Sequence, residues 1–171
     1  MKNNAYSMRA LSLLLSYPNA EMRAQLTPLI DVLTQEGALT KARLAELKAF
    51  AELLQQLDPL EVESRYVATF DRGRSTCLNL FEHVHGDSRD RGPAMIDLAQ
   101  TYAQSGLNLD PDELPDHLCV VLEFASTQTP AIAKAFLDEM ANILNAIFSG
   151  LLKRESPYAA LLAAILELSG H

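Results

Sequence analysis

The sequence predicts an all-α protein, a single compact bundle of about seven to eight helices over residues 1–171. Apolar residues recur at steps of three and four along nearly the whole chain. No segment shows the two-residue alternation between hairpin turns that is typical of strands. Proline, glycine and capping residues separate the apolar runs. A chain of 171 residues fits one domain and can bury a sizeable core without disulfides or metals.

Caps and breakers delimit the first four expected helices. The first stops at Pro18, and the second covers residues 20–36, with a break expected at Thr27-Pro28. Thr40 is the expected N-cap of the third. In the run Asp58-Pro-Leu-Glu61 a capping carboxylate precedes proline at the first helical position, which opens the fourth. The expected apolar faces contain Tyr6, Ala10, Leu11, Leu14 and Tyr17, then Leu44, Leu47, Phe50, Ala51 and Leu54, then Val62, Tyr66 and Phe70.

Four more helices follow an irregular stretch between residues 73 and 88. The fifth is expected from about residues 88–93 to Gly106, with Ile96, Ala99, Tyr102 and Ala103 along it. The sixth is expected over residues 114–125, with a proline tolerated in its first turn. Pro130 opens the seventh, expected to be the longest and to reach Leu151, and Ser156-Pro157 caps the last.

Charge and cysteine content narrow the class of protein. The formal net charge of −8 argues against nucleic acid and anionic membranes as direct partners and permits a basic peptide. No run reaches the roughly 18 apolar residues of a membrane span. The apolar run at residues 10–15 is short for a signal peptide, so a buried first helix is preferred. Cys77 and Cys119 form no disulfide framework, which fits a reduced, cytoplasmic location.

Residues 70–97 break the helical pattern. They hold four of the nine Arg, three of the seven Gly and two of the four His. Arg72, Arg74, Arg89 and Arg91 are nearly balanced by acidic residues, and a structural ion network and direct partner contact are both open interpretations. The carboxylates expected to pair with these arginines are Asp71, Glu82, Asp87 and Asp90. On that expectation, Arg89→Ala should lower the melting temperature.

Two chemical readings of this region are weak. His83-Val-His85 with Cys77 and Asp90 matches no standard zinc spacing, and Cys77 lacks a recognisable oxyanion or orienting motif for nucleophilic catalysis.

A second cluster holds Asp110, Asp112, Glu113 and Asp116, followed by His117. It is either a solvated connector with helix N-terminal carboxylates or an acidic lip beside an apolar groove that takes a basic amphipathic helix.

The run Phe70-Asp-Arg-Gly-Arg74, with Leu-Phe-Glu-His-Val-His-Gly-Asp-Ser-Arg-Asp-Arg-Gly92, resembles the delta-subunit family of respiratory nitrate reductase, the molybdenum-cofactor assembly chaperones. Glu113-Leu-Pro-Asp-His-Leu118, Ser16-Tyr-Pro18 and Arg154-Glu-Ser-Pro-Tyr158 also resemble the family, so the likeness covers nearly the whole chain. Cys77 and Cys119 depart from the pattern, where Ser and Pro are expected, and relatives often continue past residue 171 with a polar tail.

This resemblance implies a redox-enzyme maturation chaperone fold and no catalysis. It implies a cytoplasmic protein that binds the basic N-terminal segment of the apo catalytic subunit of nitrate reductase and holds it for molybdenum-cofactor insertion and membrane assembly. No permanently bound cofactor or metal is implied, and cofactor-biosynthesis proteins are further partners. The alternatives are a chaperone for another molybdenum oxidoreductase and a small metal- or thiol-dependent enzyme.

The residues expected to bind the peptide or to form the signature are Tyr66, Phe70, Asp71, Arg72, Arg74, Phe81, Glu82, His83, His85, Arg89, Asp90, Arg91, Asp116 and His117. Carboxylates of Asp71, Glu82, Asp112, Glu113 or Asp116 are expected on the rim of an apolar groove, where they would select Arg and Lys. If His83, His85 or His117 lines this rim, protonation of that histidine below about pH 6 would weaken binding of a basic peptide.

Overall fold

The computed structural model describes residues 3–171 as a helical bundle, which confirms the all-α prediction. The described residues form ten α-helices and contain no strand, only an isolated bridge between Asn79 and His117. The helices are α1 Ala5–Leu14, α2 Ala20–Ala24, α3 Leu26–Glu36, α4 Lys41–Gln56, α5 Pro59–Tyr66, α6 Arg91–Gln104, α7 Leu118–Ser126, α8 Pro130–Glu139, α9 Ala141–Lys153 and α10 Ala159–Leu168.

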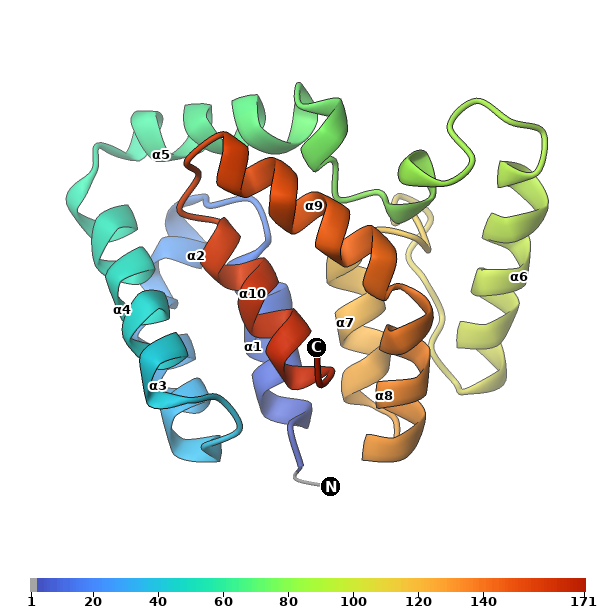
Figure 1. Cartoon of the computed structure of the whole chain (residues 1–171), viewed down its shortest axis with the longest axis horizontal. Helices are drawn as coiled ribbons and strands as arrows, with labels where there is room; N and C mark the ends of the chain where they lie inside the picture. The colour runs from blue at the N-terminus through green and yellow to red at the C-terminus, as the bar shows by residue number, and fades with distance from the viewer. Residues whose placement is uncertain (1–2) are drawn as a thin grey trace.

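The main core lies around α1 and α10, which run through the centre of the bundle (Figure 1). α1 packs against α3 and α7, and α10 packs against α4 and α9. Leu11 and Leu14 of α1 and Ile165 of α10 are completely buried. The hydrophobic run near the N-terminus is therefore explained as a core helix, because its apolar residues fill the centre of the molecule.

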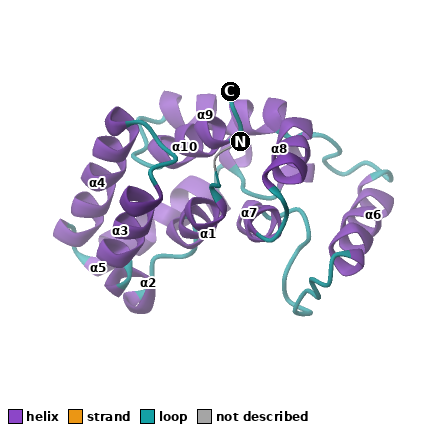
Figure 2. Ribbon diagram, turned by 90° about the horizontal axis from the view of Figure 1, so that it is seen from below, coloured by secondary structure: helices purple, strands orange, loops and turns teal. Residues whose placement is uncertain are grey.

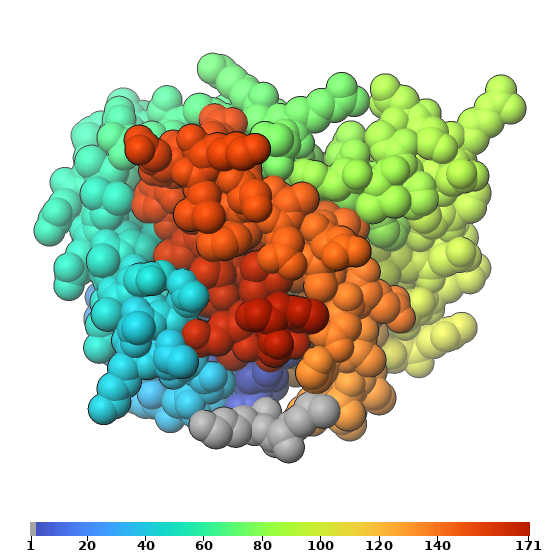
Figure 3. Space-filling model, in the orientation of Figure 1, coloured from blue at the N-terminus to red at the C-terminus, as the bar shows by residue number. Residues whose placement is uncertain are grey.

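α6 stands at the side of the bundle, as Figures 1 and 2 show. A small second core attaches it, in which Tyr102 of α6 stacks on Phe124 of α7 with ring centroids 4.7 Å apart. The Tyr102 hydroxyl donates to the Pro115 carbonyl at 2.7 Å. The space-filling view shows the yellow-green atoms of α6 next to the orange atoms of α8 (Figure 3), and Phe136 of α8 packs against this small core. On α6 the expected Tyr102 is buried, whereas the expected Ile96 is more than half exposed and Leu98 is buried in addition to Tyr102.

Two predicted helices are each divided in two, which accounts for the count of ten. The break in the segment 20–36 lies at Gln25 and not at Thr27-Pro28. Pro28 lies in the first turn of α3. A main-chain N–H has no intrahelical acceptor there, so the missing N–H of proline removes no hydrogen bond. The predicted long seventh helix is α8 and α9, bent by 65° around Met140. The apolar spacing continues across this bend because Leu137 and Leu144 both face the core.

Three predicted boundaries also shift. Residues 114–117 are not helical, because His117 is the N-cap of α7. The Asp58 carboxylate makes no capping hydrogen bond, although proline occupies the first turn of α5 as expected. The last helix begins at Ala159, after the Ser156 hydroxyl accepts the Tyr158 N–H at 3.2 Å. Thr40 does cap α4, since its hydroxyl accepts the Arg43 N–H.

A π-helical turn, residues Val67–Asp71, extends α5 toward the irregular segment. The Arg72 N–H bonds to the Val67 carbonyl at 3.1 Å, five residues back. The carbonyls left open are taken by side chains: the Arg154 guanidinium donates to the Ala68 carbonyl at 2.8 Å, and the Thr76 hydroxyl donates to Thr69. Gly73, two residues after this turn, is packed so tightly that a Cβ atom on it would collide with Arg154, Thr76 and the Thr69 carbonyl.

The segment after this turn is tied to the start of α7. It contains two short 3₁₀ turns, Arg74–Thr76 and Leu80–His83. The Leu80 N–H donates to the Asp116 main-chain carbonyl at 3.0 Å, and the Leu118 N–H donates to the Leu78 carbonyl at 2.9 Å. The Phe81 N–H donates to a carboxylate oxygen of Asp116 at 2.9 Å. We call these three contacts the 80–116 clamp.

Among the described residues no single helix has both the length and the apolarity to cross a membrane, and only the bent pair α8–α9 passes that test together.

Two glycines of the signature give a matched test of close packing. Gly73→Ala should lower the free energy of unfolding by about 1–3 kcal/mol, because its methyl group meets the Arg154 guanidinium and the hydrogen-bonded Thr76 hydroxyl and Thr69 carbonyl. Gly92→Ala, in α6 with open space around it, should raise it by about 0.5–1 kcal/mol. Urea unfolding of both variants measures the difference. Equal effects would contradict the crowding at Gly73.

The N-cap of α7 should make stability depend on pH. Nδ1 of His117 accepts the Cys119 N–H at 3.2 Å, and burial lowers the pKa of His117 against the opposing charges of Asp116 and Asp71. The contribution is fully present above about pH 6.5, the ordinary histidine value, and is lost as the pH falls, because the unfolded chain takes up the proton first. His117→Asn keeps a capping side chain and removes the titration.

Unfolding of the wild type and of His117→Asn by urea at about pH 7.5 and about pH 5.5 tests this contribution. The wild type should lose more stability on acidification than the variant. Identical losses would mean that His117 does not titrate with folding.

Candidate functional site

Three of the predicted site residues, Tyr66, Asp71 and His117, meet in one open groove of about 500 Å³. Tyr66 comes from α5, Asp71 from the π-helical turn and His117 from the N-cap of α7. Asp112, Glu113 and Leu114 of the preceding connector close one side, and Ser16 and Tyr17 after α1 close another. The 80–116 clamp holds the connector and the N-cap of α7 against the segment that follows the π-helical turn. We call this site the acidic groove.

The carboxylates of the groove are Asp71, Asp112 and Glu113, and no Lys or Arg lines it. Asp71 and Asp112 are exposed, and none of the three forms an ion pair within residues 3–171. Partial burial, followed by hydrogen bonding with Asp110, raises the pKa of Glu113. The groove thus presents negative charge that the described part of the chain does not neutralise.

The floor of the groove is apolar and rigid. Tyr66 is buried, and its hydroxyl donates to the Leu15 carbonyl at 2.6 Å. Its ring packs on Phe70 and Tyr158, with centroid separations of 4.8 and 5.7 Å. Burial raises the pKa of Tyr66 far above the usual value of a phenol, so this side chain stays neutral. Leu114 at the edge is 45% exposed and offers an apolar surface to a ligand.

The imidazole of His117 and the thiol of Cys119, which also line the groove, are uncharged at neutral pH. Burial lowers the pKa of His117, whose Nδ1 already accepts a main-chain N–H. Burial raises the pKa of the Cys119 thiol to about 12. A protonated, buried thiol is a poor nucleophile. The charge of the groove therefore comes from its carboxylates.

Two predicted site residues are structural. Asp116 is completely buried: one carboxylate oxygen holds the clamp, and the other has no hydrogen-bond partner within residues 3–171. The expectation that Asp116 stands on the rim is therefore wrong. Phe70 is 4% exposed and lies between Tyr66 and Tyr158 in the core. Neither side chain is available to a partner.

The predicted ion network of residues 70–97 forms only in part. Arg91 pairs with Glu82 at 2.5 Å, with both side chains about one-quarter exposed, so Glu82 is not a rim residue of the groove. Arg74 and Asp87 approach to 3.9 Å in solvent. Arg72, Arg89 and Asp90 are exposed and form no ion pair within residues 3–171. Exposed charges gain little from pairing, so the expected loss of stability in Arg89→Ala does not follow from this structure.

The remaining predicted residues lie outside the groove. The His83 Nε2 atom contacts the Cys77 carbonyl at 2.7 Å, and His85 stacks edge-on against Phe81, with centroids 5.5 Å apart. The expected effect of His83 or His85 protonation on a groove rim therefore has no structural basis. No three His, Cys, Asp or Glu residues within 3–171 gather as ligands for a metal.

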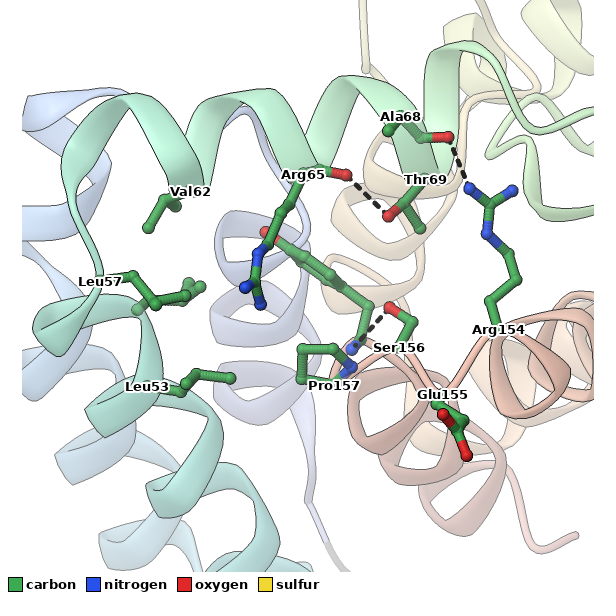
Figure 4. Close-up of a pocket in the computed structure, with 12 residues that line it drawn as sticks. Leu53, Leu57, Val62, Arg65, Ala68, Thr69, Arg154, Glu155, Ser156 and Pro157 are labelled. Atoms are coloured by element: carbon green, nitrogen blue, oxygen red, sulfur yellow. Dashed lines mark hydrogen bonds between the residues drawn. The ribbon is translucent and has the colours of Figure 1, made fainter.

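A second hollow lies between the end of α4, α5 and the turn after α9 (Figure 4). It encloses about 220 Å³ between Leu53, Leu57, Val62 and Pro157, with Arg65 and Arg154 beside it. Two polar side chains here already have partners, since Thr69 donates to the Arg65 carbonyl and Arg154 donates to the Ala68 carbonyl. Arg65 also pairs with Glu61 at 2.8 Å. This hollow is smaller than the acidic groove, and its charged lining residues are Arg65, Arg154 and a single carboxylate, Glu155.

Sequence reasoning missed Tyr17 as a site residue, although it quoted Ser16-Tyr-Pro18 as a motif. The ring of Tyr17 is 44% exposed and stands perpendicular to Tyr66 at 5.6 Å. Helical spacing assigned Tyr17 to the core face of the first helix. α1 ends at Leu14, however, and the chain turns before Tyr17. A large aromatic residue directly before a proline was the available signal, since such a residue lies outside the helix.

Comparison with known proteins assigns the family. The model of the family described as "Nitrate reductase delta subunit" matches residues 19–164. The chain is 41% identical over 159 residues to the nitrate reductase molybdenum cofactor assembly chaperone NarJ of Escherichia coli K12, covering 93% of this chain and 67% of that protein. It is 36% identical to the protein named NarJ of Bacillus subtilis 168, covering 92% and 84%.

A crystal structure from Archaeoglobus fulgidus, described as a redox enzyme maturation protein, has the same fold. The TM-score is 0.67 at 22% sequence identity, covering 94% of this chain and 90% of that one. The family match and the relatives extend over nearly all of the chain, including the groove residues of the connector and of α7. The chain therefore belongs to the nitrate reductase delta subunit family, whose relatives are named as molybdenum cofactor assembly chaperones.

Proposed function

We propose that this protein is an assembly chaperone that binds the basic N-terminal segment of the apo catalytic subunit of a nitrate reductase in the acidic groove. It holds that subunit in the cytoplasm, ready for insertion of the molybdenum cofactor and for membrane assembly. The role is one of binding, and the cofactor is received by the partner. The observation that carries the proposal is the gathering of unpaired carboxylates over an apolar floor.

Family membership supports the class of function, and the groove supports the class of ligand. Relatives named as nitrate reductase assembly chaperones cover most of this chain. Asp71, Asp112 and Glu113 suit a cationic segment, and the exposed Leu114 suits the apolar side of an amphipathic helix. A peptide that is disordered when free orders on binding, which offsets part of the gain.

Charge and apolar contact have different tasks in such a groove. Burial of apolar surface contributes about 25 cal/mol per Å² before ordering costs are subtracted, so it supplies most of the affinity. Carboxylates in solvent are screened over about 8–10 Å and contribute chiefly to association rate and selectivity. Binding should therefore weaken only modestly with added salt.

Neutralising the rim tests the charge contribution. The double variant Asp112→Asn/Glu113→Gln should bind the N-terminal peptide of a nitrate reductase catalytic subunit about tenfold more weakly, corresponding to about 1.4 kcal/mol, and with less salt dependence. Calorimetry at two salt concentrations gives both values. Asp31→Asn/Glu52→Gln removes the same charge from exposed positions of α3 and α4 and should bind like the wild type.

If both double variants bind the peptide equally weakly, the loss of affinity comes from the net charge of the protein and not from the carboxylates of the groove. Absence of binding to the wild type would refute the proposed function itself. The N-terminal peptide of a different molybdenum oxidoreductase serves as the specificity control, and tighter binding of that peptide would reassign the partner.

Removing apolar surface at the edge tests the other contribution. Leu114→Ser should weaken peptide binding about tenfold, within the range expected for burying one leucine, while the melting temperature changes little because this side chain is half exposed. Leu60→Ser on α5, 76% exposed and outside the groove, is the matched control. Unchanged affinity in Leu114→Ser would place the peptide elsewhere.

A further inference from the structure

Tyr17 stands on a rigid aromatic base beside the acidic groove. Its ring is perpendicular to that of Tyr66, with centroids 5.6 Å apart. Tyr66 is itself held by its bond to Leu15 and by its contacts with Phe70 and Tyr158. A perpendicular contact leaves at least one face of the Tyr17 ring uncovered by Tyr66, and 44% of this residue is open to solvent. An exposed aromatic face in a negative groove is a site for a cation.

Two carboxylates lie near this ring, and they differ in what they already bind. Glu63 is 3.6 Å from the guanidinium of Arg23, which also donates to the Pro18 carbonyl at 2.6 Å. Hydrogen bonding with Glu63 raises the pKa of the Tyr17 phenol, and the Asp71 charge adds to this rise. Asp71 is exposed, lines the same groove and forms no ion pair within the described residues. Asp71 is therefore the carboxylate that is open to a ligand.

We propose that Tyr17 and Asp71 form a guanidinium site, in which an arginine of the bound peptide lies on the open face of Tyr17 and pairs with the Asp71 carboxylate. This inference rests on the proposed function, because the bound peptide supplies the arginine. Arg suits the site better than Lys. Its planar guanidinium stacks on an aromatic face and pairs with a carboxylate through two parallel hydrogen bonds, whereas an ammonium is a compact and strongly hydrated charge.

The surface beyond Tyr17 suits the residues next to such an arginine. Another open hollow, of about 350 Å³, shares Ser16 and Tyr17 with the acidic groove, and its apolar lining residues are Leu13, Met22 and Leu29. Leu13 is half exposed. Tyr17 thus lies where an acidic hollow meets an apolar one, and an arginine held there directs neighbouring apolar side chains of the peptide toward α2 and α3.

A comparison of Arg and Lys peptides tests the site. The probes are the N-terminal peptide of a nitrate reductase catalytic subunit and versions with each Arg changed to Lys. The wild type and Tyr17→Phe, which keeps a ring, should prefer arginine at one position by about fivefold to tenfold. Tyr17→Leu should lose this preference while it still binds both peptides. Tyr6→Leu, an exposed tyrosine on α1 outside the acidic groove, is the control and should keep the preference.

The result that overturns the site is a Tyr17→Leu variant that weakens Arg and Lys peptides equally, or a wild type without preference at any position. Either result leaves the proposed function standing if the peptides still bind. Melting curves show whether Tyr17→Leu is folded, and Tyr17→Phe gives a second variant in which the hydroxyl alone is lost.

A small probe decides the same point without the peptide. N-acetyl-arginine amide should shift the Tyr17 ring signals in nuclear magnetic resonance spectra of the wild type, and should do so less in Asp71→Asn. N-acetyl-lysine amide should shift them less at equal concentration. Signals that do not respond to the arginine derivative would overturn the site, even if the peptide itself fails to bind and the proposed function falls.

Discussion

The 80–116 clamp is the contact on which the site depends. It joins a 3₁₀ turn to the N-terminus of α7 through two main-chain bonds and one carboxylate, and Asp116 is completely buried to make it. A buried carboxylate needs hydrogen bonds, and the Phe81 N–H supplies one to Asp116 as long as the two segments stay together. The clamp therefore fixes the connector that carries Asp112, Glu113 and Leu114 beside the aromatic floor formed by Tyr66.

The π-helical turn sets the other wall of the groove. A π turn leaves main-chain carbonyls without intrahelical donors, and here the side chains of Thr76 and Arg154 supply them. Gly73 permits the close approach that this requires. The signature run therefore serves structure at Phe70 and Gly73, while Asp71, from the same run, remains free to face the groove. Signature residues with different roles are adjacent because one irregular turn serves both purposes.

In the proposed binding mode, two kinds of surface supply affinity and selectivity. A partner helix would bury the apolar surface of the groove, whereas the carboxylates stay in solvent, where charge contributes chiefly to selectivity. The contact with Tyr66 holds the ring of Tyr17 in place, whereas an exposed tyrosine without such a contact would be free to rotate. Preorganisation of this kind lowers the ordering cost of binding.

The sequence alone determined the helical class, because apolar spacing and caps such as Thr40 act locally and survive in the folded chain. It also carried the family signature and the acidic residues of the groove. Tertiary structure decided which charges are free. Asp116 and Asp112 lie four residues apart in one acidic run, yet the first is buried in the clamp and the second is exposed on the rim. Tertiary structure also decided the bend at Met140 and the position of Tyr17. Local apolar periodicity continues through a bend, and it does not show which face of a helix the rest of the chain will cover.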